Sequence, residues 1–256
     1  MGIFDIIILG VVEGVTEFLP ISSTGHLILA SSLLGLQQTD FLKSFEIAIQ
    51  FGAILSVVFL YWKSFFDFEL LKKLAVAFLP TAAIGLIAYP LVKAYFIGNA
   101  MIVVWTLAIG GTALIVFEVL HKEPEDATAD VNAITYRQSL FIGLFQAIAI
   151  IPGVSRSAAT ILGGLLLGIS RMTIVEFSFL LAVPTMLAAT ALDLLKSAAV
   201  FSFNEFMMLA FGCIVSFVIA LGSIVWLLRF VRTHNFITFG VYRIAIAGIF
   251  LLFLLS

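Results

Sequence analysis

The stretch EGVTEFLPISSTGH, residues 13–26, places two carboxylates, a histidine and four hydroxyl side chains inside a long apolar segment. The residues before it, IFDIIILGVV, and those after it, LILASSLLGL, are mainly apolar. Its proline, Pro20, cannot continue the hydrogen-bond ladder of an α-helix. We therefore expect segment 3–35 to be a helix broken near its middle, with ionisable side chains at the break.

A second apolar segment, residues 138–169, is broken in the same way by Pro152 and Gly153. A shift of 133 residues aligns the two segments, because it places Ser22 on Ser155. The same shift pairs Gly10 with Gly143, Glu13 with Gln146, Ile21 with Val154, Thr24 with Ser157, and LLG 33–35 with LLG 166–168. This similarity predicts an internal repeat with one broken helix in each half.

The composition is that of a membrane protein. The chain has 256 residues and is 62% hydrophobic and 11% charged, whereas about a quarter of the residues in a soluble domain are charged. Its apolar segments are long enough to cross a bilayer. The predicted spans are residues 45–62, 74–91, 100–120, 177–195, 207–228 and 236–255. The net charge of −2 excludes the basic surface of a nucleic-acid partner, and the single cysteine, Cys213, excludes an internal disulfide.

Lysine and arginine residues indicate which ends of the spans face the cytoplasm. They gather in residues 63–73 and 229–235, which the positive-inside rule places on the cytoplasmic side together with the polar linker 121–137. The two broken segments then each begin and end on one side of the membrane, so we expect them to be re-entrant. Irregular backbone at membrane depth is tolerated only where protein or a water-filled cavity covers it.

The predicted fold is an all-α integral membrane protein with two inverted-topology repeats, each a re-entrant helical hairpin plus three transmembrane helices. Residues 1–256 form a single membrane domain, with repeat one at about 1–120, the linker at 121–137 and repeat two at about 138–256. Broken helices that meet near the midplane are typical of secondary transporters, so the repeat by itself favours a transporter.

The first break carries candidate catalytic groups. Glu13 and Glu17 lie four residues apart, on one face of a helix. A charge near the bilayer centre costs about 2.5–3.5 kcal/mol, so the pair indicates a function unless it lies at the solvated interface. It could hold a divalent cation, share a proton or act as a general base.

His26 could be a nucleophile, a proton donor or a packed imidazole. Three hydroxyl residues could cap the next helix as well as serve catalysis, namely Ser22, Ser23 and Thr24.

The second break, PGVSRSAAT at 152–160, predicts an anion site. Gly153 allows a tight turn, and a helix follows with Thr160 in its first turn. The N-terminus of a helix offers free N–H groups and the positive end of the dipole. Arg156 adds a planar group that matches phosphate oxygens, although it could also be a buried counterion of the acids in the first break. It is flanked by two hydroxyl residues, Ser155 and Ser157.

A meeting of the two breaks would create a phosphate-processing site at membrane depth. One would supply acids, a histidine and hydroxyls, and the other an arginine and anion-binding backbone. Glu46 and Gln50 share one face of the 45–62 span, and they are further candidates for lining this cavity together with Glu176.

The two motifs, EGVTEFLPISSTGH and PGVSRSAAT, resemble the signature motifs of the undecaprenyl-diphosphate phosphatase family, the bacitracin-resistance type. The resemblance continues through FEIAIQFGAI at 45–54, TYRQSLFIGLFQ at 135–146 and EFSFLLAVP at 176–184. It implies a bacterial inner-membrane enzyme that removes one phosphate from the C55 lipid carrier diphosphate. The monophosphate is reused for peptidoglycan and other envelope polymers. Because bacitracin sequesters the diphosphate, more enzyme confers resistance. The resemblance also implies a site that faces the outer side of the membrane.

The resemblance also implies the site residues. From the first motif it places in the site Glu13, Glu17, Ser23 and His26. From the second it places there Ser155, Arg156 and Thr160. We expect the substrate-binding set to include also Ser22, Thr24, Gly153 and Ser157.

Several alternatives remain open at this point. The attacking group could be His26, Ser23 or water, and Glu13 and Glu17 could hold Mg²⁺ or Ca²⁺ against the phosphate. No organic cofactor and no nucleic-acid partner are expected. The expected partners are a polyprenyl diphosphate, membrane lipids and a second copy in a homodimer.

The competing function is a transporter or flippase for a phosphorylated lipid or solute. Repeat symmetry favours it. The asymmetry of the two halves argues against it, because Glu17 aligns with Ile150 and His26 aligns with Ala159.

Overall fold

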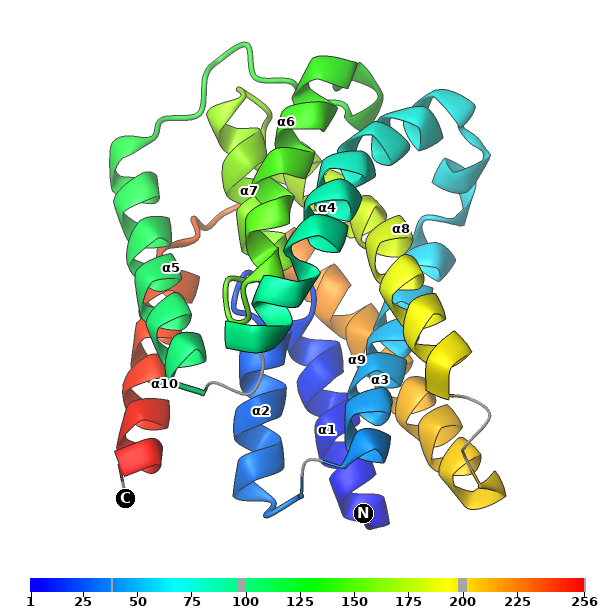
Figure 1. The fold of residues 1–256 in the computed structure, drawn as a ribbon. Helices are drawn as coiled ribbons and strands as arrows, with labels where there is room; N and C mark the ends of the chain where they lie inside the picture. The colour runs from blue at the N-terminus through cyan, green and yellow to red at the C-terminus, as the bar shows by residue number, and fades with distance from the viewer. Residues whose placement is uncertain (38, 96–99, 198–201, 256) are drawn as a thin grey trace.

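The computed structural model describes residues 1–37, 39–95, 100–197 and 202–255. Its α-helices are α1 (Ile3–Thr16), α2 (Ser23–Leu33), α3 (Asp40–Leu60), α4 (Phe68–Tyr95), α5 (Ala100–Leu120), α6 (Tyr136–Ala147), α7 (Arg156–Leu166), α8 (Arg171–Ser197), α9 (Phe203–Val231) and α10 (Ile237–Leu255) (Figure 1). Three short 3₁₀ helices are η1 (Trp62–Phe66), η2 (Val131–Ala133) and η3 (Ile148–Ile150). Within the described residues the only β-structure is an isolated bridge between Thr128 and Ile169, so the predicted all-α class is confirmed.

In the part of the chain that the structure describes, six helices are long and apolar enough to cross a membrane, namely α3, α4, α5, α8, α9 and α10. They correspond to the six predicted spans, but several begin earlier than hydropathy indicated. Helix α3 begins at Asp40 because the Thr39 side chain caps it by accepting a hydrogen bond from the Leu42 N–H at 3.1 Å. Helix α4 likewise begins at Phe68. Lys72 and Lys73 therefore lie on this helix, and the predicted start of this span at residue 74 was too late.

Both predicted breaks are present. Helix α1 ends at Thr16 and α2 begins at Ser23, with Pro20 in the turn between them. Helix α6 and η3 end before Pro152, and α7 begins after the turn. In Figure 1 the α1–α2 pair occupies the lower half of the molecule and the α6–α7 pair the upper half. The two turns meet in the middle, where the Ser157 hydroxyl donates to the Phe18 carbonyl at 2.8 Å.

Residues that the 133-residue shift aligns share unusual backbone conformations. Ser22 and Ser155 each have a φ of 71°, which is uncommon for a residue other than glycine. Gly35 and Gly168 follow with φ values of 65° and 74°. These matched conformations support the predicted internal repeat. Its inverted orientation across a membrane and the repeat boundaries remain predictions.

We call residues 17–22, between α1 and α2, the first turn, and residues 151–155, between η3 and α7, the second turn. A large group of buried apolar side chains surrounds the first turn. Phe18 is fully buried, and its ring meets the edge of Phe179 from α8 at a centroid distance of 5.3 Å. Such a pair contributes about 0.5–1.5 kcal/mol beyond the area it buries. The contact holds the end of α1 beside α8, and this brings Glu17 to the side of the second turn.

Candidate active site

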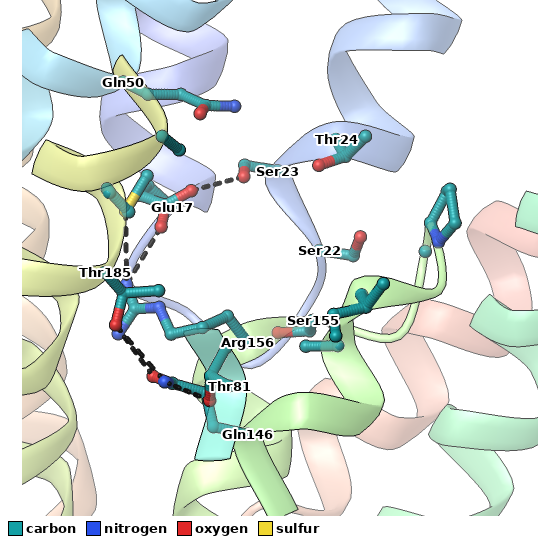
Figure 2. A pocket seen from close by; sticks show the side chains of 16 residues that line it. Glu17, Ser22, Ser23, Thr24, Gln50, Thr81, Gln146, Ser155, Arg156 and Thr185 are labelled. Carbon is teal, nitrogen blue, oxygen red and sulfur yellow. Dashed lines mark hydrogen bonds and ion pairs between the residues drawn. The ribbon is translucent and has the colours of Figure 1, made fainter. Parts of the chain in front are cut away.

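The two turns enclose a cavity of about 230 Å³ together with side chains from α3, α4 and α8. This space is large enough for several water molecules, so it suits a small polar group. The lining residues, shown in Figure 2, are Glu17, Ser22, Ser23, Thr24, Gln50, Thr81, Gln146, Ala149, Ile150, Pro152, Gly153, Ser155, Arg156, Thr185, Met186 and Ala189.

Glu17 joins the two halves of the site. One of its carboxylate oxygens accepts a hydrogen bond from the Ser23 hydroxyl, and the other lies 2.9 Å from Nη2 of Arg156 (Figure 2). Its side chain is 6% exposed. A carboxylate bonded to a serine hydroxyl in a buried pocket is positioned to accept the proton of that serine.

Arg156, at the start of α7, is held by Glu17 at the end of α1 and by Ser178 of α8. Its Nη2 donates to Glu17, and its Nη1 donates to the Ser178 carbonyl of α8 at 2.7 Å. Its Nε is buried and has no partner among the described residues. The sequence left open whether Arg156 is a counterion or a phosphate ligand. The geometry shows the ion pair, and the position of Arg156 on the cavity wall leaves the ligand role available.

The N-termini of α2 and α7 both open into the cavity. Ser22 and Ser155 precede these helices and line the cavity. The Ser155 hydroxyl accepts from the Ala158 N–H at 3.2 Å, whereas the Ser22 hydroxyl makes no capping bond. The first N–H groups of a helix lack partners within the helix, so two converging N-termini favour an anion.

Four of the predicted site residues do not line the cavity, namely Glu13, His26, Ser157 and Thr160. Ser157 bonds the first turn through the Phe18 carbonyl. Thr160 donates to the Arg156 carbonyl and accepts from the Ser178 hydroxyl at 3.1 Å. These two hydroxyls therefore stabilise the turns through hydrogen bonds outside the cavity.

Glu13 lies one helical turn behind Glu17. It is fully buried, and neither carboxyl oxygen has a hydrogen-bond partner among the described residues. Glu17, Glu46 and Arg156 lie close enough to interact with it electrostatically. Within the described residues no cluster of three or more His, Cys, Asp or Glu side chains is arranged to hold a metal. A cation in this region would depend on two carboxylates and on oxygens of a ligand.

Both ring nitrogens of His26 are engaged away from the cavity. Its Nδ1 donates to the Ser22 carbonyl at 2.8 Å, and its Nε2 lies 2.9 Å from the Tyr242 hydroxyl. The two rings are stacked, with centroids 5.5 Å apart. A carbonyl oxygen only accepts, so in the neutral ring Nε2 accepts the Tyr242 proton.

Sequence reasoning missed a polar group on the cavity wall. Gln146 donates through Nε2 to the hydroxyls of Thr81 at 2.8 Å and Thr185 at 3.2 Å (Figure 2). Of the further candidates, Gln50 lines the cavity and Glu46 does not. Isolated threonines are common in membrane helices and give no signal by themselves. The alignment of Gln146 with Glu13 was the one local indication.

The chain is similar to known proteins over almost its whole length. Residues 6–249 match the family described as bacitracin resistance protein BacA. The undecaprenyl-diphosphatase of Persephonella marina is 51% identical over 100% of both chains. That of Sulfurihydrogenibium sp. (strain YO3AOP1) is 49% identical over 98% of this chain and 99% of its own. That of Aquifex aeolicus is 49% identical over 97% of both chains.

Proposed function

The chain belongs to the bacitracin resistance protein BacA family, and we propose that it hydrolyses undecaprenyl diphosphate to undecaprenyl phosphate and inorganic phosphate. One observation carries the proposal most directly. Within one polar cavity, Glu17 contacts both a serine hydroxyl and an arginine. This is the arrangement that an acid–base partner, a nucleophile and a phosphate ligand need. The reaction returns the lipid carrier to peptidoglycan synthesis and lowers the amount of diphosphate that bacitracin can bind.

Substrate binding would depend on the positive charge of Arg156 and on the hydrogen-bond donors that line the cavity. The terminal phosphate would lie against the guanidinium of Arg156, which lines the cavity, and against the N-termini of α2 and α7. Hydroxyls of Ser22, Thr24 and Ser155 face the same space. Donors that already point at the phosphate need no reorganisation when charge builds up in the transition state, and this is the main source of their effect.

Ser23 is the nucleophile that the geometry favours, because it lines the cavity and its hydroxyl is bonded to Glu17. Its Oγ forms a bond to the terminal phosphorus while the bond from that phosphorus to the bridging oxygen breaks. Glu17 takes the Ser23 proton and passes it to the departing undecaprenyl phosphate, which leaves with the bridging electron pair.

Water completes the reaction. It attacks the phosphorus on Ser23 and gives its proton to Glu17, while the bond between phosphorus and Oγ breaks. Glu17 then returns the proton to Oγ, and inorganic phosphate leaves. His26 is less suited to attack because its Nε2 faces Tyr242. We assign it to supporting the first turn through the Ser22 carbonyl.

A divalent cation fits this donor set. Glu13 offers two buried oxygens without partners, one turn from Glu17. Mg²⁺ is commonly bound by one or two carboxylates together with substrate phosphates. Such a cation would supply neutralisation of phosphate charge when bound, and Glu13 and Glu17 are the residues that would hold it.

The protein is a multi-pass membrane protein by its six apolar helices and its family. We further propose that it lies in the bacterial inner membrane with the cavity open to the outer side. The linker between α5 and α6 lies at the end of the molecule opposite the two termini (Figure 1), and basic residues at that end support a cytoplasmic position for it. A homodimer remains a prediction. The transporter alternative is not favoured, since the matched relatives are named as diphosphatases.

Phosphate release by the purified protein tests the proposal. Undecaprenyl diphosphate is supplied in detergent, and inorganic phosphate and the lipid product are both measured. We expect one phosphate released per undecaprenyl phosphate formed, and no release by Ser23→Ala. Wild-type protein that binds the lipid but releases no phosphate would contradict the proposed activity, and full activity of Ser23→Ala would remove Ser23 as the nucleophile.

A further inference from the structure

Arg243 is a fully buried arginine in the middle of the apolar helix α10. It does not line the cavity, and no carboxylate pairs with it in the part of the chain that the structure describes. An ionisable residue inside a membrane segment usually faces the bundle interior and has a partner there. What Arg243 contacts instead of an acid indicates its role.

Among the described residues, the hydrogen-bond partners of Arg243 are backbone carbonyls. They come from the first turn, the second turn and α5, and they are Pro20 (3.3 Å), Gly153 (3.0 Å), Val154 (3.1 Å), Thr106 (3.1 Å) and Leu107 (3.4 Å). The single nitrogen Nη1 donates both to the Pro20 carbonyl of the first turn and to the Val154 carbonyl of the second turn. A planar guanidinium fixes the directions of its donors, so the two turns are held at one separation and one angle.

The neighbouring helix α5 has glycines where the Arg243 side chain packs against it. Gly110 and Gly111 of α5 lie against Arg243, and a Cβ on Gly110 would overlap its guanidinium. Thr106, also on α5, adds a hydrogen bond from its hydroxyl to the Pro152 carbonyl at 2.8 Å. The preceding residue on α10, Tyr242, contacts His26 of the first half. Helices α5 and α10 therefore form a common support for both turns.

We infer that Arg243 is a positioning residue, which holds the α1–α2 turn and the α6–α7 turn in register so that Glu17 and Ser23 face Ser155 and Arg156. As it concerns the rate of hydrolysis, this inference rests on the proposed function. The turns lack regular secondary structure, and their carbonyls would otherwise be buried without partners. Loss of the guanidinium would let the turns shift relative to each other without removing any group that touches the phosphate.

The kinetic test compares Arg243→Lys and Arg243→Met with wild type. Misplacement of reacting groups by about 1 Å can cost about 100-fold in rate, so we expect a loss of kcat of about that size for Arg243→Met and a smaller loss for Arg243→Lys. KM should change much less, because the phosphate ligands remain. Arg171→Met is the matched control. It removes a partly buried arginine that pairs with Glu118 and Glu123 and does not line the cavity, so it should lower thermal stability and leave kcat near wild type.

A double-substitution cycle separates positioning from general stability. Arg243→Lys is combined with Arg156→Lys, and kcat is measured well below the unfolding temperature of each variant. Suppose that Arg243 acts by aligning Arg156 with the first turn. Then Arg243→Lys should lower kcat much less in the Arg156→Lys protein than in the wild type. Equal fold losses in both backgrounds would overturn the inference, as would wild-type kcat in Arg243→Lys and Arg243→Met.

The distance between the two turns tests the role of Arg243 without measuring catalysis. Spin labels are placed at the exposed Thr24 and Ile148, one beside each turn, in a Cys213→Ala background. Wild-type Arg243 should give a narrow distance distribution, and Arg243→Lys or Arg243→Met a broader or shifted one. An unchanged distribution in folded variants would refute the positioning role even if the protein hydrolyses the lipid. If the wild type does not hydrolyse it, the distances still decide the role of Arg243.

Discussion

The substitution Arg156→Lys tests the site most sharply, because it keeps the charge and removes the planar donor group. In the structure Nη2 binds Glu17 and Nη1 binds the Ser178 carbonyl, and the residue forms part of the cavity wall. A lysine has one ammonium group and cannot maintain these separate directions. It would keep a charge beside Glu17 and lose at least one donor to the phosphate.

The expected magnitude follows from that loss. Removal of one donor to a developing oxyanion costs about 2.7–4 kcal/mol, so kcat should fall by about 10²–10³. Stability should change little, because a cation still neutralises Glu17. Arg156→Ala behaves differently. The side chains of Arg156 and Glu17 are 12% and 6% exposed, and breaking a buried pair by removing one partner costs about 3–5 kcal/mol.

The assay is phosphate release from undecaprenyl diphosphate in detergent, with thermal unfolding measured on the same samples. Arg171→Lys is the matched control, because it makes the same change at a partly buried ion pair outside the cavity. Wild-type turnover by Arg156→Lys, combined with instability of Arg156→Ala, would show that Arg156 is only a counterion and would refute the assigned phosphate contact.

Three further predictions concern the acids and the topology. Glu17→Gln keeps the shape of the side chain but cannot accept the Ser23 proton, so turnover should fall by about 100-fold or more while the protein still folds; near-normal turnover would exclude Glu17 as the base. If Glu13 and Glu17 hold a divalent cation, EDTA should abolish phosphate release and Mg²⁺ or Ca²⁺ should restore it, whereas activity unaffected by chelation would contradict that site. Single cysteines at Lys72 and Asp126 should resist an impermeant thiol reagent in whole cells and react after lysis, and labelling from outside would invert the proposed orientation.

The two breaks and the six spans were predictable because their causes are local. Pro20 and Pro152 each remove a donor from the helical hydrogen-bond ladder, and long apolar runs can only be satisfied as membrane helices. Proline alone did not decide the breaks, because Pro184 lies inside α8. The beginnings of the helices were less predictable. Thr39 caps α3 outside the apolar run, so hydropathy placed the start of this helix too late.

The separate roles of the two acids could not be predicted from spacing. Residues four apart share a helical face, but α1 ends at Thr16, so Glu17 lies at the break and Glu13 one turn deeper. The same limit applies to His26, whose partner Tyr242 is distant in the sequence. Arg243 gave a signal as an arginine in an apolar span, but its carbonyl partners depend on how both turns pack.

The ion pair between Glu17 and Arg156 links the fold to the chemistry. Each residue would be an uncompensated charge if its half of the protein stood alone, since both side chains are largely buried. The charges are balanced only when the two turns meet, so the same contact that assembles the halves also assembles the site. A phosphate that enters brings its own negative charge to Arg156 and competes with Glu17 for it. Displacing Glu17 from the arginine leaves its carboxylate with the Ser23 proton as its closest partner, which is the state that the proposed attack requires.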